Sequence, residues 1–304
     1  MKTMNSAFDS LPDGIVLLDG GMGQELINRK ASGQGVLWSA KALFDFPDAV
    51  VAVHEDYIRA GADVITTNSY ACIRNNFAPE GLADRLGEMN RLSAELAQRA
   101  RDNVGVPVLI AGSMGPQNGS YRPDLVGSYA DTEALYREQA DFLAPHVDFF
   151  ICETLSCLLE ARAAVTAASS TGKPVWLSWS IEDSGAARLR SGESVGDAWQ
   201  DIAGSDVDAV LLNCSPPEAI SRVLPALKSI CDIPVGAYAN AFTPIPEKWD
   251  FHGDESIPPS RTDLTPTAYA QHARRWIAAG ARVIGGCCEV GPAHIAELHR
   301  LRSI

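Results

Sequence analysis

The sequence predicts an α/β fold: one (β/α)8 TIM barrel that occupies residues 1–304 as a single domain. Three observations support this prediction. The chain has 304 residues, 46% of them hydrophobic, which is enough to bury the core of one such barrel. Eight short apolar runs alternate with helical patterns, and no linker-like segment interrupts the alternation. Continuous apolar runs of this kind are typical of parallel strands that are buried on both faces.

The elements follow one another in a regular order. The predicted strands are residues 15–21, 63–70, 107–114, 148–154, 174–181, 209–214, 234–240 and 283–288. The predicted helices are residues 48–60, 80–103, 131–144, 156–170, 194–203, 217–230, 266–279 and 292–302. Gly61 and Gly280 follow two of these helices as stop signals, and Pro292 opens the last one. The chain thus contains eight strand–helix units, which is the number that forms a closed TIM barrel.

Three of the connections that follow predicted strands are long. They are βα loop 1 (22–46), loop 3 (115–130) and loop 7 (241–265). In a TIM barrel the βα loops form the catalytic face, and loops of this length usually act as lids or binding walls. We therefore expect loops 1, 3 and 7 to enclose a site.

Composition excludes several classes of function. The chain carries 25 basic and 38 acidic residues, a formal charge of -13, and it has no basic cluster or glycine-rich phosphate loop. We therefore expect no nucleic-acid partner. No apolar run approaches the roughly 18 residues of a membrane span, and the start lacks a signal-peptide pattern. This predicts a cytoplasmic protein without a membrane partner, and a homo-oligomer is possible.

Cysteine is the most informative residue type. Seven cysteines in a long chain do not resemble a secreted disulfide framework. Cys214 ends the sixth predicted strand, and Cys287 and Cys288 end the eighth. The side chains of adjacent residues on a regular strand point to opposite faces. Cys287 and Cys288 can therefore both reach one metal only if the strand bends there. Gly285 and Gly286 provide that freedom. Three thiolates leave one tetrahedral position open, which is typical of catalytic Zn²⁺; the alternatives are buried free thiols or a strained disulfide between neighbours.

With these motifs in order, the chain resembles the homocysteine S-methyltransferase family of zinc-dependent barrels. The resemblance rests on LDGGMG at 18–23, ETL at 153–155, NC at 213–214 and GGCC at 285–288. It implies that Cys214, Cys287 and Cys288 are the catalytic residues and the zinc ligands. It further implies a set of substrate-binding residues around the same rim: Asp19, Gly20, Thr67, Asn68, Glu153 and Asn213.

Within that set the resemblance implies different tasks. Asp19 and Glu153 would hold the amino group of homocysteine, whereas Thr67 and Asn68 would meet its carboxylate and backbone. Gly20 would let the substrate approach closely. Ordinary structural roles compete with each assignment: Asp19 and Gly20 could serve a turn, Glu153 could contact the start of a helix, and the polar pair could cap a strand.

The methyl donor is less clearly indicated. The segment LWSAK at 37–41 resembles the first loop of S-methylmethionine enzymes. Trp38 and Trp249, both on long loops, could form part of an aromatic box for a sulfonium or quaternary ammonium cation, or could simply anchor a lid. Thr154 stands where betaine-type relatives have tyrosine, which argues against betaine.

Two further positions depart from the family pattern. Glu289 stands where many members have glycine, and it adds a charge next to the second cysteine of the pair. The segment 240–242 (NAF) replaces a more usual proline-containing turn, so the wall made by the seventh loop could be reshaped.

These observations lead to three hypotheses. The first is a zinc-dependent S-methyltransferase that moves a methyl group from a small sulfonium donor, such as S-methylmethionine, to the thiol of L-homocysteine. The second is a homocysteine methyltransferase module that uses betaine or a corrinoid donor in trans, since the chain has no room for a cobalamin domain. The third is a zinc-binding or thiol-sensing barrel without turnover. The sequence does not name the donor.

Overall fold

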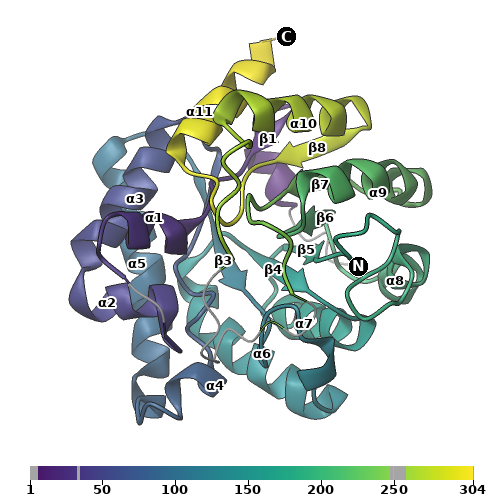
Figure 1. Cartoon of the computed structure of the whole chain (residues 1–304). Helices are drawn as coiled ribbons and strands as arrows, with labels where there is room; N and C mark the ends of the chain where they lie inside the picture. Colours follow the sequence, from purple (N-terminus) through teal and green to yellow (C-terminus); the bar gives the residue numbers. More distant parts are fainter. Residues whose placement is uncertain (1–5, 33–34, 247–248, 250–257, 304) are drawn as a thin grey trace.

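An eight-stranded parallel sheet forms the centre of the molecule in the computed structural model, which describes residues 6–32, 35–246, 249 and 258–303 (Figure 1). The strands are β1 (Val16–Leu17), β2 (Val64–Thr66), β3 (Leu109–Met114), β4 (Phe149–Leu155), β5 (Val175–Trp179), β6 (Ala209–Asn213), β7 (Val235–Tyr238) and β8 (Ala281–Ile284). All eight predicted strands are present, although most are shorter than predicted.

The sheet curls until its two ends meet. Each strand pairs in parallel with the next one, and β1 pairs with β8. Between β1 and β2 the contact is a single bridge, Leu18 to Val64, where the Asp19 amide donates to the Val64 carbonyl at 3.0 Å. The predicted α/β fold, a TIM barrel, is thus confirmed.

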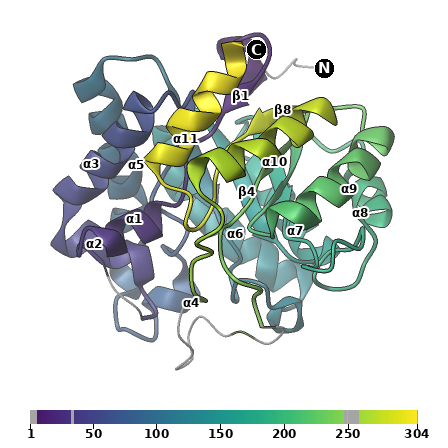
Figure 2. The same cartoon turned by 45° about the horizontal axis from the view of Figure 1, so that its top comes forward.

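Helices surround the barrel on its outside (Figures 1 and 2). The eight that follow the strands are α3 (Pro47–Arg59), α5 (Leu86–Val104), α6 (Tyr129–Leu143), α7 (Leu158–Ser169), α8 (Val195–Ile202), α9 (Pro217–Ile230), α10 (Pro266–Ala278) and α11 (Pro292–His299). Their starts have a chemical cause. The side chains of Ser128, Ser194 and Thr265 accept from backbone amides in the first turns of α6, α8 and α10. No helix among the described residues is long and apolar enough to cross a bilayer.

The core has two layers. One lies between the strands and the helices, and the other fills the barrel interior with residues such as Val16, Phe149 and Trp176. Phe8, on the short helix η1 (Ala7–Ser10), stacks on Trp176 with ring centroids 4.9 Å apart. Apolar side chains therefore fill the barrel interior, and the polar residues Asp19, Thr67 and Glu153 lie at the carboxyl ends of the strands.

The βα loops differ in part from the predicted loops. Loop 1 is not irregular: it contains α1 (Met22–Asn28), η2 (Trp38–Ala40) and α2 (Lys41–Asp45). The loop after β2 contains α4 (Arg74–Phe77), which the sequence did not indicate. The helix predicted over 80–103 begins as the short η3 (Ala83–Arg85), which α5 follows directly. Loop 3 contains η4 (Pro123–Leu125). Residues 247–248 and 250–257 of loop 7 lie outside the described residues. The remaining short helices are η5 (Ala144–His146) and η6 (Arg300–Ser303).

Candidate active site

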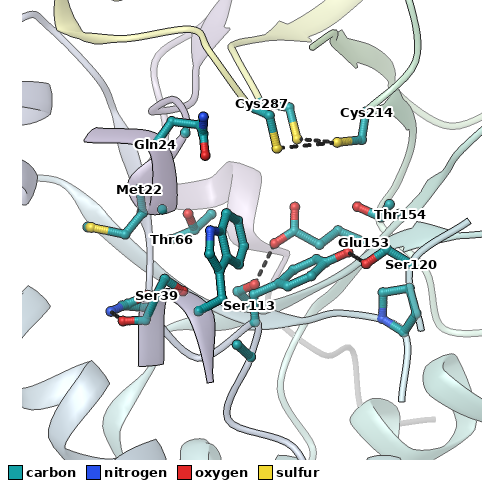
Figure 3. A pocket seen from close by; sticks show the side chains of 18 of the residues that line it. Met22, Gln24, Ser39, Thr66, Ser113, Ser120, Glu153, Thr154, Cys214 and Cys287 are labelled. Carbon is teal, nitrogen blue, oxygen red and sulfur yellow. Dashed lines mark hydrogen bonds between the residues drawn. The ribbon is translucent and has the colours of Figure 1, made fainter. Parts of the chain in front are cut away.

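A cavity opens at the carboxyl ends of the strands (Figure 3). Loops 1, 3 and 7 and the loop after β2 all contribute to its wall. Its lining includes acidic, sulfur-containing and aromatic side chains: Asp19, Trp38, Tyr70, Tyr121, Glu153, Cys214, Tyr238, Phe242, Trp249, Cys287 and Cys288. All the predicted rim residues except Asn213 thus line one cavity.

The three predicted thiols lie together at the top of this cavity (Figure 3). The Sγ atom of Cys214 lies 2.8 Å from that of Cys287 and 3.8 Å from that of Cys288. All three sulfur atoms lie within 4.8 Å of one another, so a single ion could contact all of them. Three soft thiol donors match the ligand preference of zinc. The residues present therefore fit the implied metal.

The cysteine pair lies in a turn beyond β8, not on a bent strand as expected. The Gly286 amide donates to the Asp19 carbonyl, the Cys287 amide to the Ala239 carbonyl, and the Ala241 amide to the Cys288 carbonyl, each at 3.0 Å. Backbone bonds from the loops after β1 and β7 thus hold the turn on both sides.

The glycine pair before the cysteines has a packing role. Neither glycine has a positive φ, so backbone freedom is not the reason for glycine here. A Cβ on Gly285 would lie 2.6 Å from the Cβ of Leu18, and one on Gly286 would lie 2.1 Å from a methyl of Val290. Only glycine leaves room for β1 and the following turn to approach.

Cys214 is presented by a left-handed backbone conformation, with φ of 46°. The side-chain amide of Asn213, the residue directly before Cys214, is hydrogen-bonded to other residues of the protein. Its Oδ1 accepts from the Thr154 amide at 2.9 Å and the Ser178 hydroxyl at 2.7 Å, and its Nδ2 donates to the Thr154 hydroxyl at 2.8 Å. Asn213 is not among the residues that line the cavity, and its Nδ2 lies 4.0 Å from the Cys287 sulfur, so its side chain links Thr154 on β4 to the cysteine turn.

Tyr121 on loop 3 is a site residue that the sequence did not reveal. Its hydroxyl lies 2.9 Å from the Cys214 sulfur, and the Arg190 guanidinium lies 4.6 Å from the centre of its ring. Burial opposes ionisation of Cys214, but hydrogen bonds from the two neighbouring thiols and from Tyr121 outweigh it and lower the pKa of Cys214. No sequence pattern marks a tyrosine inside an irregular loop.

Two buried carboxyl groups face the cavity below the sulfur atoms. Burial raises the pKa of Asp19 well above its usual range, although the Thr66 amide donates to its Oδ2 at 2.7 Å. Burial likewise raises the pKa of Glu153 to about 7, against hydrogen bonds from Ser113 and Tyr238. No lysine, arginine or histidine is among the described residues that line the cavity. The cavity therefore favours a cationic ligand.

The other predicted substrate residues occupy different places. Thr67 and Asn68 line the cavity; the Thr67 hydroxyl accepts from the Ser113 amide, and the Asn68 Nδ2 donates to the Ser39 carbonyl at 2.9 Å. Gly20 also lines it, but a Cβ there would lie 2.0 Å from the Val290 carbonyl oxygen. The structure thus gives Gly20 a packing reason to be glycine.

Both predicted donor tryptophans lie in the cavity wall. Trp38 packs against Gly23, where a Cβ would lie 2.2 Å from the indole ring, and its ring meets that of Tyr70 edge-on at 6.2 Å. Trp249 is buried, and its ring centroid lies 5.9 Å from that of Tyr121. Phe242, from the unusual segment 240–242, adds another aromatic face.

Comparison with known proteins agrees with this geometry. A family model described as homocysteine S-methyltransferase matches residues 16–301. The chain belongs to the homocysteine S-methyltransferase family. It is an enzyme of that family, since the match covers both the barrel and the cysteine triad.

Several relatives of this methyltransferase cover nearly the whole chain. The homocysteine S-methyltransferase YbgG of Bacillus subtilis is 31% identical over 98% of this chain and 97% of its own. The selenocysteine methyltransferase of Astragalus bisulcatus is 29% identical over 94% of this chain and 92% of its own. The crystal structure of the homocysteine methyltransferase MmuM from Escherichia coli, metallated form, superposes with a TM-score of 0.81 at 30% identity, and covers 95% of this chain and 96% of that one.

Proposed function

We propose that this methyltransferase moves a methyl group from a small sulfonium donor, of the S-methylmethionine type, to the thiol of L-homocysteine, giving methionine. The supporting observation is the content of one cavity: three converging thiols, two buried carboxyl groups and several aromatic rings, with no cationic side chain among its described lining residues. Such a cavity is matched to an amino-acid ammonium group and a second cation.

We assign the metal to the triad. Cys214, Cys287 and Cys288 would hold Zn²⁺ as thiolates. Bound there, zinc would supply Lewis acidity that lets the acceptor thiol lose its proton near neutral pH and stay nucleophilic. Tyr121 supports this arrangement from the side, because its hydroxyl already contacts the Cys214 sulfur. Asn213 would contribute from behind the triad, because its side chain accepts from the Thr154 amide and its Nδ2 lies 4.0 Å from the Cys287 sulfur.

The acceptor's amino-acid end would lie against β1, β2 and β4. Asp19 and Glu153 are nearly unexposed, at 3% and 8%, so each carboxylate carries a desolvation cost that an ammonium group would offset. Thr67 and Asn68 line the same part of the cavity and would contact the carboxylate and backbone. Held at that end, homocysteine would extend its thiol toward the sulfur triad.

The donor would lie among the aromatic rings of Trp38, Tyr121, Phe242 and Trp249. Ring faces attract cations that have lost part of their water, and a sulfonium is such a cation. During transfer the acceptor sulfur forms a bond to the methyl carbon while the donor's S–CH₃ bond breaks. The bonding pair stays on the donor sulfur as a neutral sulfide, which needs no proton, and the enzyme's contribution is positioning.

A panel of substrates tests this proposal. Zinc-loaded enzyme is incubated with homocysteine and, separately, with S-methylmethionine, dimethylsulfoniopropionate, S-adenosylmethionine or betaine, and methionine is quantified by mass spectrometry. Selenocysteine is included as an acceptor, because a relative is described as a selenocysteine methyltransferase. Methionine from a sulfonium donor is expected. Product from betaine alone would contradict the donor assignment, and no product from any pair would favour a binding or sensing role.

A further inference from the structure

Gln24 and Glu289 form a pair beside the cysteine turn. Gln24 lies in the first turn of α1, lines the cavity and is only 7% exposed. Its Nε2 donates a hydrogen bond to Oε1 of Glu289, which directly follows Cys288. The other amide atom, Oε1 of Gln24, is buried and has no hydrogen-bond partner within the described part of the chain. A buried acceptor of this kind needs a hydrogen-bond donor or a positive charge, and a ligand in the cavity can provide it.

Glu289 determines which way the amide of Gln24 points. A carboxylate only accepts hydrogen bonds, so it binds the amide nitrogen and turns the amide oxygen away from itself. In Figure 3 that oxygen points into the cavity, on the side of Cys287. Glu289 has a left-handed backbone with φ of 63°, in a turn closed by the Val290 amide and the Cys287 carbonyl at 3.1 Å. The turn that carries the cysteines thus also orients Gln24.

We propose that Gln24 is a specificity-determining residue whose Oε1 contacts the cationic group of the methyl donor, and that Glu289 is its positioning residue. This inference rests on the proposed function. The acceptor's ammonium group already has Asp19 and Glu153 as partners, so the oxygen of Gln24 remains for the second cation. Gln24 lines the same cavity as Cys287 and is hydrogen-bonded to the residue that follows Cys288, so it lies near the sulfur triad at which donor and acceptor sulfur would meet.

The pair can attract a cation without placing a third carboxylate in the cavity. The amide carries a dipole with its negative end at Oε1, and a carboxylate bonded to the amide nitrogen strengthens that dipole. A neutral sulfide or an uncharged analogue lacks the positive charge that this dipole attracts. Gln24 therefore favours the charged donor over its demethylated product.

Binding measurements test the inference directly. The affinity of zinc-loaded, full-length enzyme for S-methylmethionine is measured by calorimetry for wild type, Gln24→Met, Glu289→Ala and the double variant. Gln24→Met keeps the size and removes the oxygen, and it should weaken binding about tenfold. Glu289→Ala should weaken it similarly, and the double variant should be no weaker than Gln24→Met. Glu289→Gln keeps an acceptor for the Gln24 amide and should restore most of the affinity.

A steady-state measurement distinguishes the donor from the acceptor. In Gln24→Met the KM for S-methylmethionine should rise about tenfold, while the KM for homocysteine stays within about twofold of wild type. Glu25→Gln is the matched control, because it removes a carboxylate from the same helix outside the cavity lining. Donor affinity equal in wild type and Gln24→Met, or a rise confined to the homocysteine KM, would overturn the inference. Wild-type turnover of the donor panel decides the proposed function separately.

Discussion

The carboxylate of Glu153 on β4 accepts a hydrogen bond of 3.2 Å from the hydroxyl of Tyr238 on β7, across the mouth of the barrel. Two strands, β5 and β6, separate these residues along the sheet. The bond therefore reaches across the barrel interior and holds a buried acid at the base of the cavity.

Glu153→Gln should stabilise the ligand-free protein at neutral and alkaline pH. The folded-state pKa, about 7, exceeds the ordinary value of 4.5, so the acid's contribution is favourable below about 4.5 and is lost as pH rises through 7. Removing the buried charge should raise the free energy of unfolding by up to about 3 kcal/mol at about pH 8 and change it little at about pH 4.5. Denaturant titrations at both pH values measure this; equal gains at both would contradict it.

The same variant should bind homocysteine poorly. An amide at position 153 would leave the acceptor ammonium with Asp19 as its only carboxylate, so the KM for homocysteine should rise at least about tenfold while the donor KM changes little. A variant that gains stability and loses acceptor affinity would identify Glu153 as a binding residue. An unchanged homocysteine KM would remove it from the site.

Cys214→Ala should abolish both metal binding and turnover. Its sulfur lies 2.8 Å from that of Cys287 and 3.8 Å from that of Cys288, so its loss leaves a pair that should hold zinc far more weakly. We expect less than roughly one tenth of the wild-type zinc content by mass spectrometry and a loss of activity of at least about a thousandfold. Cys231→Ala is the control, because Cys231 lies outside the cavity lining and the variant should keep its zinc. Undiminished methionine formation by Cys214→Ala would contradict the metal assignment.

Chelation should inactivate the enzyme without unfolding it. The sulfur triad lies beyond the strand ends, whereas most residues of the two core layers belong to strands and helices. Far-ultraviolet circular dichroism should therefore stay unchanged when zinc is removed, and activity should return when zinc is added back. Loss of helical signal on chelation would indicate a structural zinc.

Gly20→Ala should destabilise the fold and not merely reduce substrate affinity. A Cβ at this position would lie 2.0 Å from the Val290 carbonyl oxygen and 2.9 Å from the Tyr57 hydroxyl. Relieving the first contact would require the backbone at Val290 to move. We expect a loss of about 2 kcal/mol or more in the free energy of unfolding. Gly127→Ala is the control for the glycine substitution alone, because Gly127 has no positive φ and a Cβ there would meet only the Thr132 hydroxyl, at 3.9 Å. If the Gly20→Ala variant is as stable as wild type and its KM for homocysteine is raised, Gly20 is needed for substrate binding and not for packing.

Much of the fold could be predicted because buried parallel strands have continuous apolar runs. All eight strands were found this way, and helix starts such as Thr265 and Pro292 follow local rules. Helix α1 was missed since it is only seven residues long and follows two glycines. So short a helix shows too few turns for an apolar period to be seen.

The site was predictable where chemistry is carried by rare residue types at strand ends. Cys214, Cys287 and Cys288 satisfy that condition, and the structure brings them together. Tyr121 and Gln24 do not, because their positions depend on loop backbone and on a partner far away in the chain. The reason given for the glycine pair was wrong: crowding against Leu18 and Val290, and not backbone freedom, requires it.

The lack of basic side chains in the described cavity wall affects the release of the demethylated donor after each turnover. Under the proposed reaction, a positively charged sulfur becomes neutral in the same step that consumes the acceptor thiol. The acidic cavity then holds one cation fewer, and no lysine or arginine of the described lining takes its place. The attraction that brought the donor in is cancelled by the reaction itself, so the spent sulfide should dissociate readily and inhibit only weakly.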